Sequence, residues 1–275
     1  FEKEGGKYAP VGDRLLVKFA EHEDAWEVCG LYTQELFKAY QEGSPMEEIM
    51  KEWKKMDFKP DGVYTGFLAG ARQVDVILKF VEMFCTKETH ILIDPVMGDQ
   101  GNVYRTYSEE LCEKMRTLAQ QATVITPNLT EALLLLHGEQ GMRERMEAFS
   151  HMGESQELKE IEQLGKELAH HFRLESIVIT GVDVVCEDGS VKMGNLVIEK
   201  DEADWYFSIK EGGSYSGTGD LFASVICGSR LNGFSTEEAA ERAGKFLYDS
   251  IADTMNDDTA PNDGVNFEKF LWELM

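Results

Sequence analysis

A glycine-rich segment, GGSYSGTGD from Gly212 to Asp220, runs directly into an apolar stretch that begins at Leu221 and is predicted as a helix. Glycines ahead of a helix let successive backbone N–H groups converge on one point, where the helix dipole adds positive potential. The pattern indicates an anion site, and Asp220 at the helix start could accept a proton from an attacking hydroxyl. A turn followed by an acidic helix-start residue is the alternative interpretation. No Lys follows the glycines, and Phe222 stands where a dinucleotide fingerprint has its third glycine, so the segment is neither a Walker A loop nor that fingerprint.

Three other apolar runs, each predicted as a strand, end in polar residues. Ligands of open α/β sheets bind at the carboxyl ends of strands, and carboxylate, hydroxyl and amide oxygens there suit Mg²⁺, a substrate hydroxyl or a phosphate. Each group also has a local explanation, namely a turn, a helix-capping box or a strand-to-loop turn. Together with the anion-binding helix start, however, they favour a phosphoryl or nucleotide site. The residues are Asp94 and Asp99 after the run 91–93, Thr126, Asn128 and Glu131 after the run 123–125, and Thr180 after the run 176–179.

The elements that must position these residues alternate between short apolar runs and longer amphipathic ones. This alternation predicts a parallel sheet with helices on its faces. In residues 184–209 the texture changes to residues that alternate in character along the chain, broken by turns at 187–189 and 201–202. This pattern predicts antiparallel strands at the sheet edge. Residues 138–155 are polar without sustained periodicity and are predicted as a loop. The predicted strands are 62–64, 90–93, 123–125 and 176–179, and the predicted helices are 71–84, 108–120, 129–136, 157–172, 219–231 and 236–253.

The first 44 residues carry a weaker pattern. Residues 14–19 are predicted as a strand and residues 25–40 as a helix.

Composition narrows the classes of function. Among 275 residues, 51 acidic and 27 basic side chains give a formal net charge of -24, which argues against a nucleic-acid or membrane partner. The longest apolar run, 132–136, is far shorter than the roughly 20 residues that span a bilayer. The five cysteines are dispersed without a Cys-x-x-Cys pair, which is typical of reduced thiols and predicts a cytoplasmic protein. The six histidines form no metal-ligand pattern.

The motifs taken together resemble those of the pyridoxal kinases of the ribokinase-like superfamily. The resemblance covers about residues 45–275 and implies a single ribokinase-like kinase domain over residues 1–275. The implied fold is a three-layer αβα sandwich with a mainly parallel central sheet and antiparallel edge strands. Residues 1–44 are atypical, because the Asp-Leu-Ser-Gly-like strand and Gly-Arg helix start that open family members are not found there. The matching segments are FKPDGVYTGFL (58–68), DPVMGDQG (94–101) with Tyr104, TPNLTEA (126–132) and SGTGDLF (216–222).

The resemblance implies ATP-dependent phosphorylation of the 5′-hydroxymethyl group of pyridoxal, pyridoxine or pyridoxamine, by a homodimer that uses Mg²⁺ and a monovalent cation. It also implies a role for each matching residue. Asp220 is the catalytic base, the amides of Gly217, Thr218 and Gly219 hold the transferring phosphoryl group, and Tyr64 lines the vitamin pocket. The remaining roles concern nucleotide and metal: Glu131 and Asn128 organise magnesium at the nucleotide, Asp94 and Thr126 lie near the phosphates and the monovalent cation, Asp99 and Tyr104 lie on a flap over ATP, and Thr180 contacts its phosphates.

Two other functions stay open. A hydroxymethylpyrimidine kinase of the same superfamily shares the nucleotide end, although Asp99 with Gln100, Gly101 and Tyr104 favours the pyridoxal type. A non-catalytic degenerate kinase that binds nucleotide or vitamin is the alternative from another class. The presence of Asp220 argues against it, because a protein that only binds has no need of a base.

Overall fold

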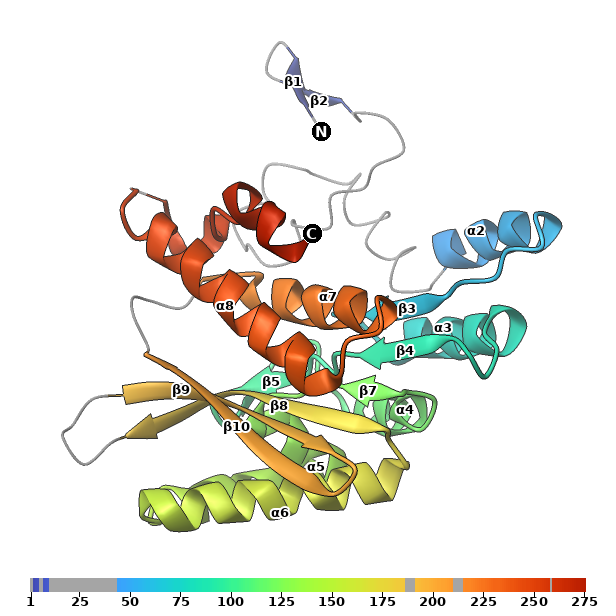
Figure 1. Cartoon of the computed structure of the whole chain (residues 1–275). Coiled ribbons are helices and arrows are strands. Elements are labelled where there is room, and N and C mark those ends of the chain that lie inside the picture. The colour runs from blue at the N-terminus through green and yellow to red at the C-terminus, as the bar shows by residue number, and fades with distance from the viewer. Residues whose placement is uncertain (1, 5–6, 10–43, 186–190, 210–214, 258) are drawn as a thin grey trace.

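A computed structural model describes residues 2–4, 7–9, 44–185, 191–209, 215–257 and 259–275 (Figure 1). Helices surround a central six-stranded sheet. The strand order is β10-β9-β8-β7-β4-β3. The pairs from β3 to β8 are parallel, and β8, β9 and β10 pair antiparallel, so the predicted mixed sheet is confirmed. The strands are β3 (Gly62–Thr65), β4 (His90–Ile93), β7 (Val124–Ile125), β8 (Ser176–Val185), β9 (Val191–Glu199) and β10 (Glu202–Ile209).

Two separate pairs of short strands complete the β structure, β1 (Glu2–Glu4) with β2 (Lys7–Ala9) and β5 (Gly98–Asp99) with β6 (Asn102–Val103). The predicted strand 14–19, the predicted helix 25–40 and the predicted turn 187–189 lie outside the described residues.

Helices cover both faces of the sheet, because its strands alternate buried apolar side chains between two cores. Ile91 and Ile93 of β4 lie in the core under one helical layer, and Leu92 lies in the core under the other. Burial on both faces is what a parallel sheet requires. One layer holds α3 (Ala71–Phe84), α4 (Glu109–Ala119), α5 (Leu129–Phe149) and α6 (Glu154–Phe172); the other holds α7 (Thr218–Leu231), α8 (Thr236–Thr254) and the 3₁₀-helix η3 (Glu268–Leu274).

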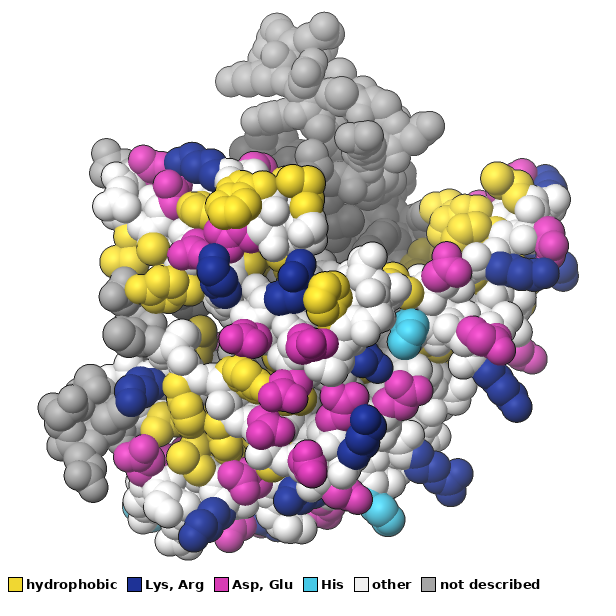
Figure 2. All heavy atoms as spheres, in the orientation of Figure 1, with side chains coloured by type: hydrophobic (Ala, Val, Ile, Leu, Met, Phe, Trp, Pro, Cys, Tyr) yellow, Lys and Arg dark blue, Asp and Glu magenta, His cyan; other side chains and the backbone are white. Residues whose placement is uncertain are grey.

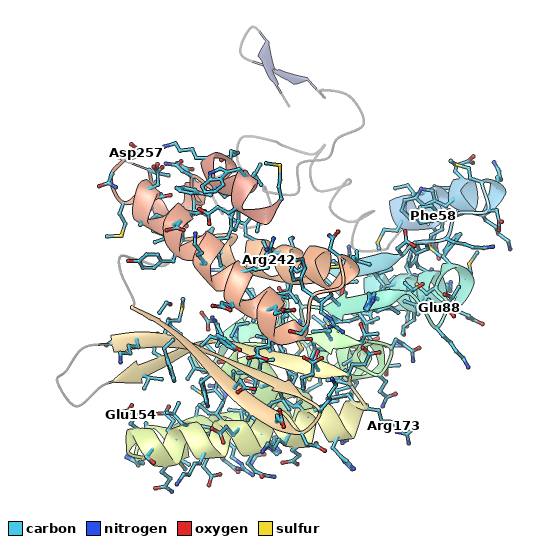
Figure 3. All side chains as sticks on the ribbon, viewed as in Figure 1. Phe58, Glu88, Glu154, Arg173, Arg242 and Asp257 are labelled. Atoms are coloured by element: carbon cyan, nitrogen blue, oxygen red, sulfur yellow. The ribbon has the colours of Figure 1, made fainter. Side chains whose placement is uncertain are left out.

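Side chains fill the layer between α6 and the sheet in Figure 3, where Glu154 and Arg173 mark the two ends of this helix. Three helical elements lie outside the predicted set, and η3 is one of them. α2 (Ser44–Lys55) packs on α3 through an aromatic cluster around Trp53, and η2 (Pro261–Asp263) precedes the C-terminal helix.

The prediction of a loop over residues 138–155 is wrong. α5 continues to Phe149 after a sharp break at Gly138, whose φ of 70° is the left-handed conformation that favours glycine. Arg116 stabilises the break by donating to the carbonyls just before it, those of Leu134 (2.8 Å) and Leu135 (2.7 Å). Beyond the break, Met142 is fully buried, so tertiary packing holds this polar segment in a helix.

The strand predicted over 176–179 is longer in the structure, where β8 continues to Val185. The register shifts between Ile179 and Val182, where Gly181 has a φ of 66° and donates its N–H to Asn195 Oδ1 (3.1 Å). Such a bulge lets a strand continue past an irregular residue. A turn between β9 and β10 is confirmed, one residue earlier than the predicted 201–202: its two residues are Lys200 and Asp201, both with positive φ.

Asp and Glu side chains are prominent on the face that α8 and α6 present in Figure 2, in keeping with the net charge of -24. Within the described ranges, no helix combines the length and apolar character needed to cross a bilayer.

Candidate active site

Three of the predicted strand-end residues lie in register along the carboxyl edge of the parallel strands. The N–H of Asp94 donates to the carbonyl of Thr65 (2.8 Å), which places the residue after β4 beside the end of β3. The N–H of Thr126 donates to the last carbonyl of β4 (3.1 Å), and the N–H of Thr180 donates to the carbonyl of Pro127 (2.9 Å). The backbone therefore brings these three residues, from β4, β7 and β8, and Thr65 of β3 to one edge, where ligands of α/β sheets bind.

Asn128 and Glu131 form a capping box at the start of α5, as the local interpretation of their spacing predicts. Asn128 Oδ1 accepts the N–H of Glu131 (3.0 Å), and Glu131 Oε2 accepts the N–H of Asn128 (2.9 Å). Both side chains also hold the loop after β4, because Glu131 Oε1 accepts the N–H of Met97 (3.0 Å) and Asn128 Nδ2 donates to the carbonyl of Gly98 (2.8 Å). The box thus fixes α5 and the 94–101 segment to one another.

Two buried acids lie at the centre of this edge. Asp94 is 8% exposed and Glu131 is 4% exposed, and neither is in an ion pair with Lys or Arg within the part of the chain that is described. Burial and the nearby charge of Asp220 raise the pKa of Asp94 to about 7. Burial and the charge of Asp94 raise the pKa of Glu131 well above its usual range. An acid pair in this state binds a proton or a cation readily.

Asp220 lies near these acids in space, although it belongs to a distant part of the sequence, the start of α7. It is an exposed residue in the first turn of α7, and its Oδ1 accepts a hydrogen bond from the hydroxyl of Tyr64 (3.0 Å), near the end of β3. Burial, with the charges of Asp94 and Asp220, raises the pKa of Tyr64, so the phenol stays protonated and is the donor.

The described part of the glycine-rich segment begins at Tyr215 and leads into α7, as the sequence pattern predicts. Gly217 is the N-cap with a φ of 81°, a conformation that side chains rarely adopt. The Thr218 hydroxyl donates to the carbonyl of Tyr215 (3.1 Å) and closes the turn. The first N–H groups of a helix have no acceptor within it, so those of Thr218 and Gly219 are available to an anion.

Asp99 lies on the β5–β6 hairpin, and Tyr104 directly follows that hairpin; both side chains are exposed. Gln100 and Gly101 both have positive φ and form its two-residue turn. The N–H of Gly101 donates to Thr130 Oγ1 (2.9 Å), which attaches the hairpin to α5. Backbone N–H groups thus attach the hairpin that carries Asp99 to α5, and Thr180 to Pro127. A hydrogen bond joins Tyr64 to Asp220, and Asp94 interacts electrostatically with Tyr64, Asp220 and Glu131.

Two residues of the site, Thr65 and Gly66 at the end of β3, lie in the matching segment 58–68 but have no predicted role. Thr65 is buried, and its hydroxyl has no hydrogen-bond partner among the described residues. A Cβ on Gly66 would lie 3.0 Å from the Tyr64 hydroxyl and 3.1 Å from Asp220 Oδ1, so glycine leaves room for that pair. The strand-end rule that selected Thr126 and Thr180 applies equally to Thr65 and could have found it.

The donor set fits a hard cation. The hydroxyl of Thr126 is buried beside Asp94 and, like that of Thr65, makes no hydrogen bond of normal geometry with the rest of the described chain. Carboxylate and hydroxyl oxygens are the ligands that Mg²⁺ and monovalent cations prefer. Among the described residues, no group of three or more His, Cys, Asp or Glu side chains is placed so that it could hold a metal ion.

Known proteins resemble this chain over most of its length. The family profile described as phosphomethylpyrimidine kinase matches residues 44–262. The pyridoxine/pyridoxal/pyridoxamine kinase of Bordetella avium is 28% identical over 204 residues, which are 72% of this chain and 62% of that protein. The hydroxymethylpyrimidine/phosphomethylpyrimidine kinase of Bacillus subtilis is 25% identical over 207 residues, 72% of this chain and 66% of that protein. The chain thus spans less than two thirds of the length of either relative.

A solved structure agrees with these relatives. A Bacteroides thetaiotaomicron protein, provisionally assigned as a phosphomethylpyrimidine kinase and crystallised with pyridoxal, has a TM-score of 0.72 and 30% identity. The similarity covers 84% of this chain and 76% of that one. The resemblance that the motifs indicate is confirmed: the chain belongs to the ribokinase-like family of phosphomethylpyrimidine and pyridoxal kinases.

Proposed function

We propose that the protein transfers the γ-phosphoryl group of ATP to the 5′-hydroxymethyl group of a vitamin B6 vitamer. The observation that carries this proposal is the position of Asp220. It is an exposed carboxylate in the first turn of α7, beside free helix N–H groups and within the electrostatic reach of Asp94. A base next to an anion site is the arrangement that phosphoryl transfer to a hydroxyl requires. The pyridoxal bound by the Bacteroides relative supports the choice of substrate class.

In the proposed reaction, the substrate hydroxyl oxygen forms a bond to the γ-phosphorus while the bond from that phosphorus to the β,γ-bridging oxygen breaks, and ADP leaves. The hydroxyl proton passes to the carboxylate of Asp220. The N–H groups of Gly217, Thr218 and Gly219 stabilise the charge on the phosphoryl oxygens, with the helix dipole behind them. Tyr64 forms part of the wall of the vitamin pocket.

The nucleotide and its cations would bind along the edge formed by β4, β7 and β8. Asn128 and Thr180 are proposed to contact the nucleotide, and Asp99 and Tyr104 to cover it from the β5–β6 hairpin and the segment that follows it. Glu131 is proposed to hold Mg²⁺ through its water shell, whereas Asp94 and Thr126 suit a monovalent cation. Mg²⁺ held there would neutralise charge on the transferred phosphate.

A hydroxymethylpyrimidine is the second candidate substrate. It is favoured by the description of the matching family profile and by the Bacillus relative. Both substrates present a hydroxymethyl group on a flat nitrogen heterocycle, so the same base and the same anion site would serve either.

The test is the substitution Asp220→Asn, which keeps the shape of the side chain and removes the base. With ATP and pyridoxal, we expect kcat to fall by about 10²- to 10⁴-fold, with nucleotide affinity changed little. Asp204→Asn, at an exposed residue of β10, is the matched control and should keep wild-type turnover. Equal turnover in Asp220→Asn and the wild type would overturn the assignment of the base, and nucleotide binding without any turnover by the wild type would favour a protein that only binds.

A further inference from the structure

Only one oxygen of the Asp220 carboxylate is held by a hydrogen bond within the described residues. The phenol of Tyr64 donates to Oδ1 at 3.0 Å across 156 residues of sequence. Oδ2 is left for a substrate hydroxyl. A carboxylate held at one oxygen loses rotational freedom about its terminal torsion, which is otherwise broad.

The backbone around this pair is shaped to admit it. Gly66 follows β3 by one residue, and a Cβ there would meet both the phenol oxygen (3.0 Å) and Asp220 Oδ1 (3.1 Å). Both separations are tighter than ordinary van der Waals contact, so a Cβ at position 66 would require the phenol, the carboxylate or both to shift. The pairing of Tyr64 with Asp220 thus depends on a glycine that has no strained φ of its own.

The surroundings keep the phenol a donor. Burial and the charges of Asp94 and Asp220 all disfavour the phenolate, so Tyr64 has a proton to donate whenever Asp220 is ionised. A hydrogen bond to a charged acceptor is stronger than one between neutral groups.

We infer that Tyr64 is a positioning residue, whose hydroxyl, admitted by Gly66, orients the carboxylate of Asp220 so that Oδ2 faces the substrate hydroxyl. This inference rests on the proposed function, because it assigns Tyr64 a task only if Asp220 is the base. It goes beyond the pocket-wall role, which needs the ring of Tyr64 and not its hydroxyl.

The first test is Tyr64→Phe, which keeps the ring and removes the hydroxyl. We expect kcat to fall about tenfold, with KM for ATP and for the vitamer within about twofold of wild type. Tyr107→Phe is the matched control, because the Tyr107 hydroxyl also donates to a carboxylate, that of Glu109 (3.3 Å), away from Asp220. That control should keep wild-type kcat. A wild-type kcat in Tyr64→Phe, or a higher KM with kcat unchanged, would overturn the inference and leave Tyr64 as a pocket wall.

A second variant provides a readout that loss of packing would not give. Gly66→Ala should lower kcat in the wild-type background, and its added effect should be smaller in Tyr64→Phe, because the phenol oxygen, one of the two atoms that the new Cβ meets, is gone there while Asp220 Oδ1 remains. Additive effects of the two substitutions would contradict the inference. If Tyr64→Phe does not fold, Gly66→Ala alone tests it, and wild-type kcat in that variant overturns it. Absence of turnover in the wild type would overturn the proposed function itself, and this inference with it.

Discussion

Replacing Asp94 by asparagine removes a buried charge without changing the shape of the side chain. Its carboxylate is 8% exposed, and burial together with the charge of Asp220 raises its pKa from an ordinary 3.8 to about 7. Because the folded-state pKa is the higher one, folded Asp94 keeps a proton that the unfolded chain has already released between these pH values. The free energy of unfolding of the wild type should therefore fall as pH rises from about 4 toward 7.

The size of the effect follows from the shift. A rise from 3.8 to about 7 corresponds to about 4 kcal/mol at about 1.36 kcal/mol per pKa unit, present in full below pH 3.8 and lost by pH 7. Between pH 5 and 7.5 the wild type should lose about 2–3 kcal/mol that Asp94→Asn keeps. The raised pKa of Glu131 acts in the same direction, and removing the charge of Asp94 relieves part of it.

Urea unfolding of both proteins at pH 5.0 and 7.5, without nucleotide or added divalent cation, measures this difference. Asp204→Asn, an exposed carboxylate, is the control and should follow the wild type at both pH values. If the stability difference between Asp94→Asn and the wild type does not grow with pH, Asp94 is not a destabilising buried charge, and the cation site argued from it loses its main support.

Two further substitutions test separate parts of the site. Asn128→Ala should lower the free energy of unfolding by about 1–2 kcal/mol and raise KM for ATP. Ser235→Ala, which removes the matching cap of α8, should lower the free energy of unfolding by about 1 kcal/mol and leave the kinetics unchanged. Urea unfolding measures the stability of the two variants, and steady-state kinetics measures their KM and kcat. Equal kinetics in the two would separate Asn128 from nucleotide binding. Gly217→Ala, at a φ of 81°, should cost about 1–2 kcal/mol in urea unfolding and lower kcat, since the strain displaces the N–H groups of the anion site; an unchanged kcat would place the phosphoryl group elsewhere.

Periodicity alone predicted the elements that carry a strong one-sided pattern. The bounds of α3 and β4 agree with the prediction, because each combines a clear apolar period with a polar or glycine boundary. The second half of α5 was missed because Gly138 and many charged residues hide a sparse apolar stripe. Met142, Met146 and Phe149 nevertheless follow helical spacing and pack on the core, so the signal was present.

The sequence predicted which residues at the strand ends belong to the candidate site, but not the contacts that join them to distant parts of the chain. Asp94, Thr126 and Asn128 each follow a recognisable apolar run, so the rule for strand ends selects them. The bond between Tyr64 and Asp220 depends on how α7 packs against β3 and spans 156 residues, which no local pattern encodes. The burial of Asp94 and Glu131 is also a property of the folded chain that no local pattern encodes.

Substrate phosphorylation is the most direct test of the proposed kinase. The protein is incubated with ATP and Mg²⁺ and, separately, with pyridoxal, pyridoxine, pyridoxamine or hydroxymethylpyrimidine, and the phosphorylated product is followed by mass spectrometry. We predict that a vitamin B6 vitamer gains one phosphoryl group, with the highest kcat/KM of the panel. Phosphorylation of hydroxymethylpyrimidine alone would contradict the vitamin B6 assignment, and no product from any of the four while ATP binds would contradict the kinase itself.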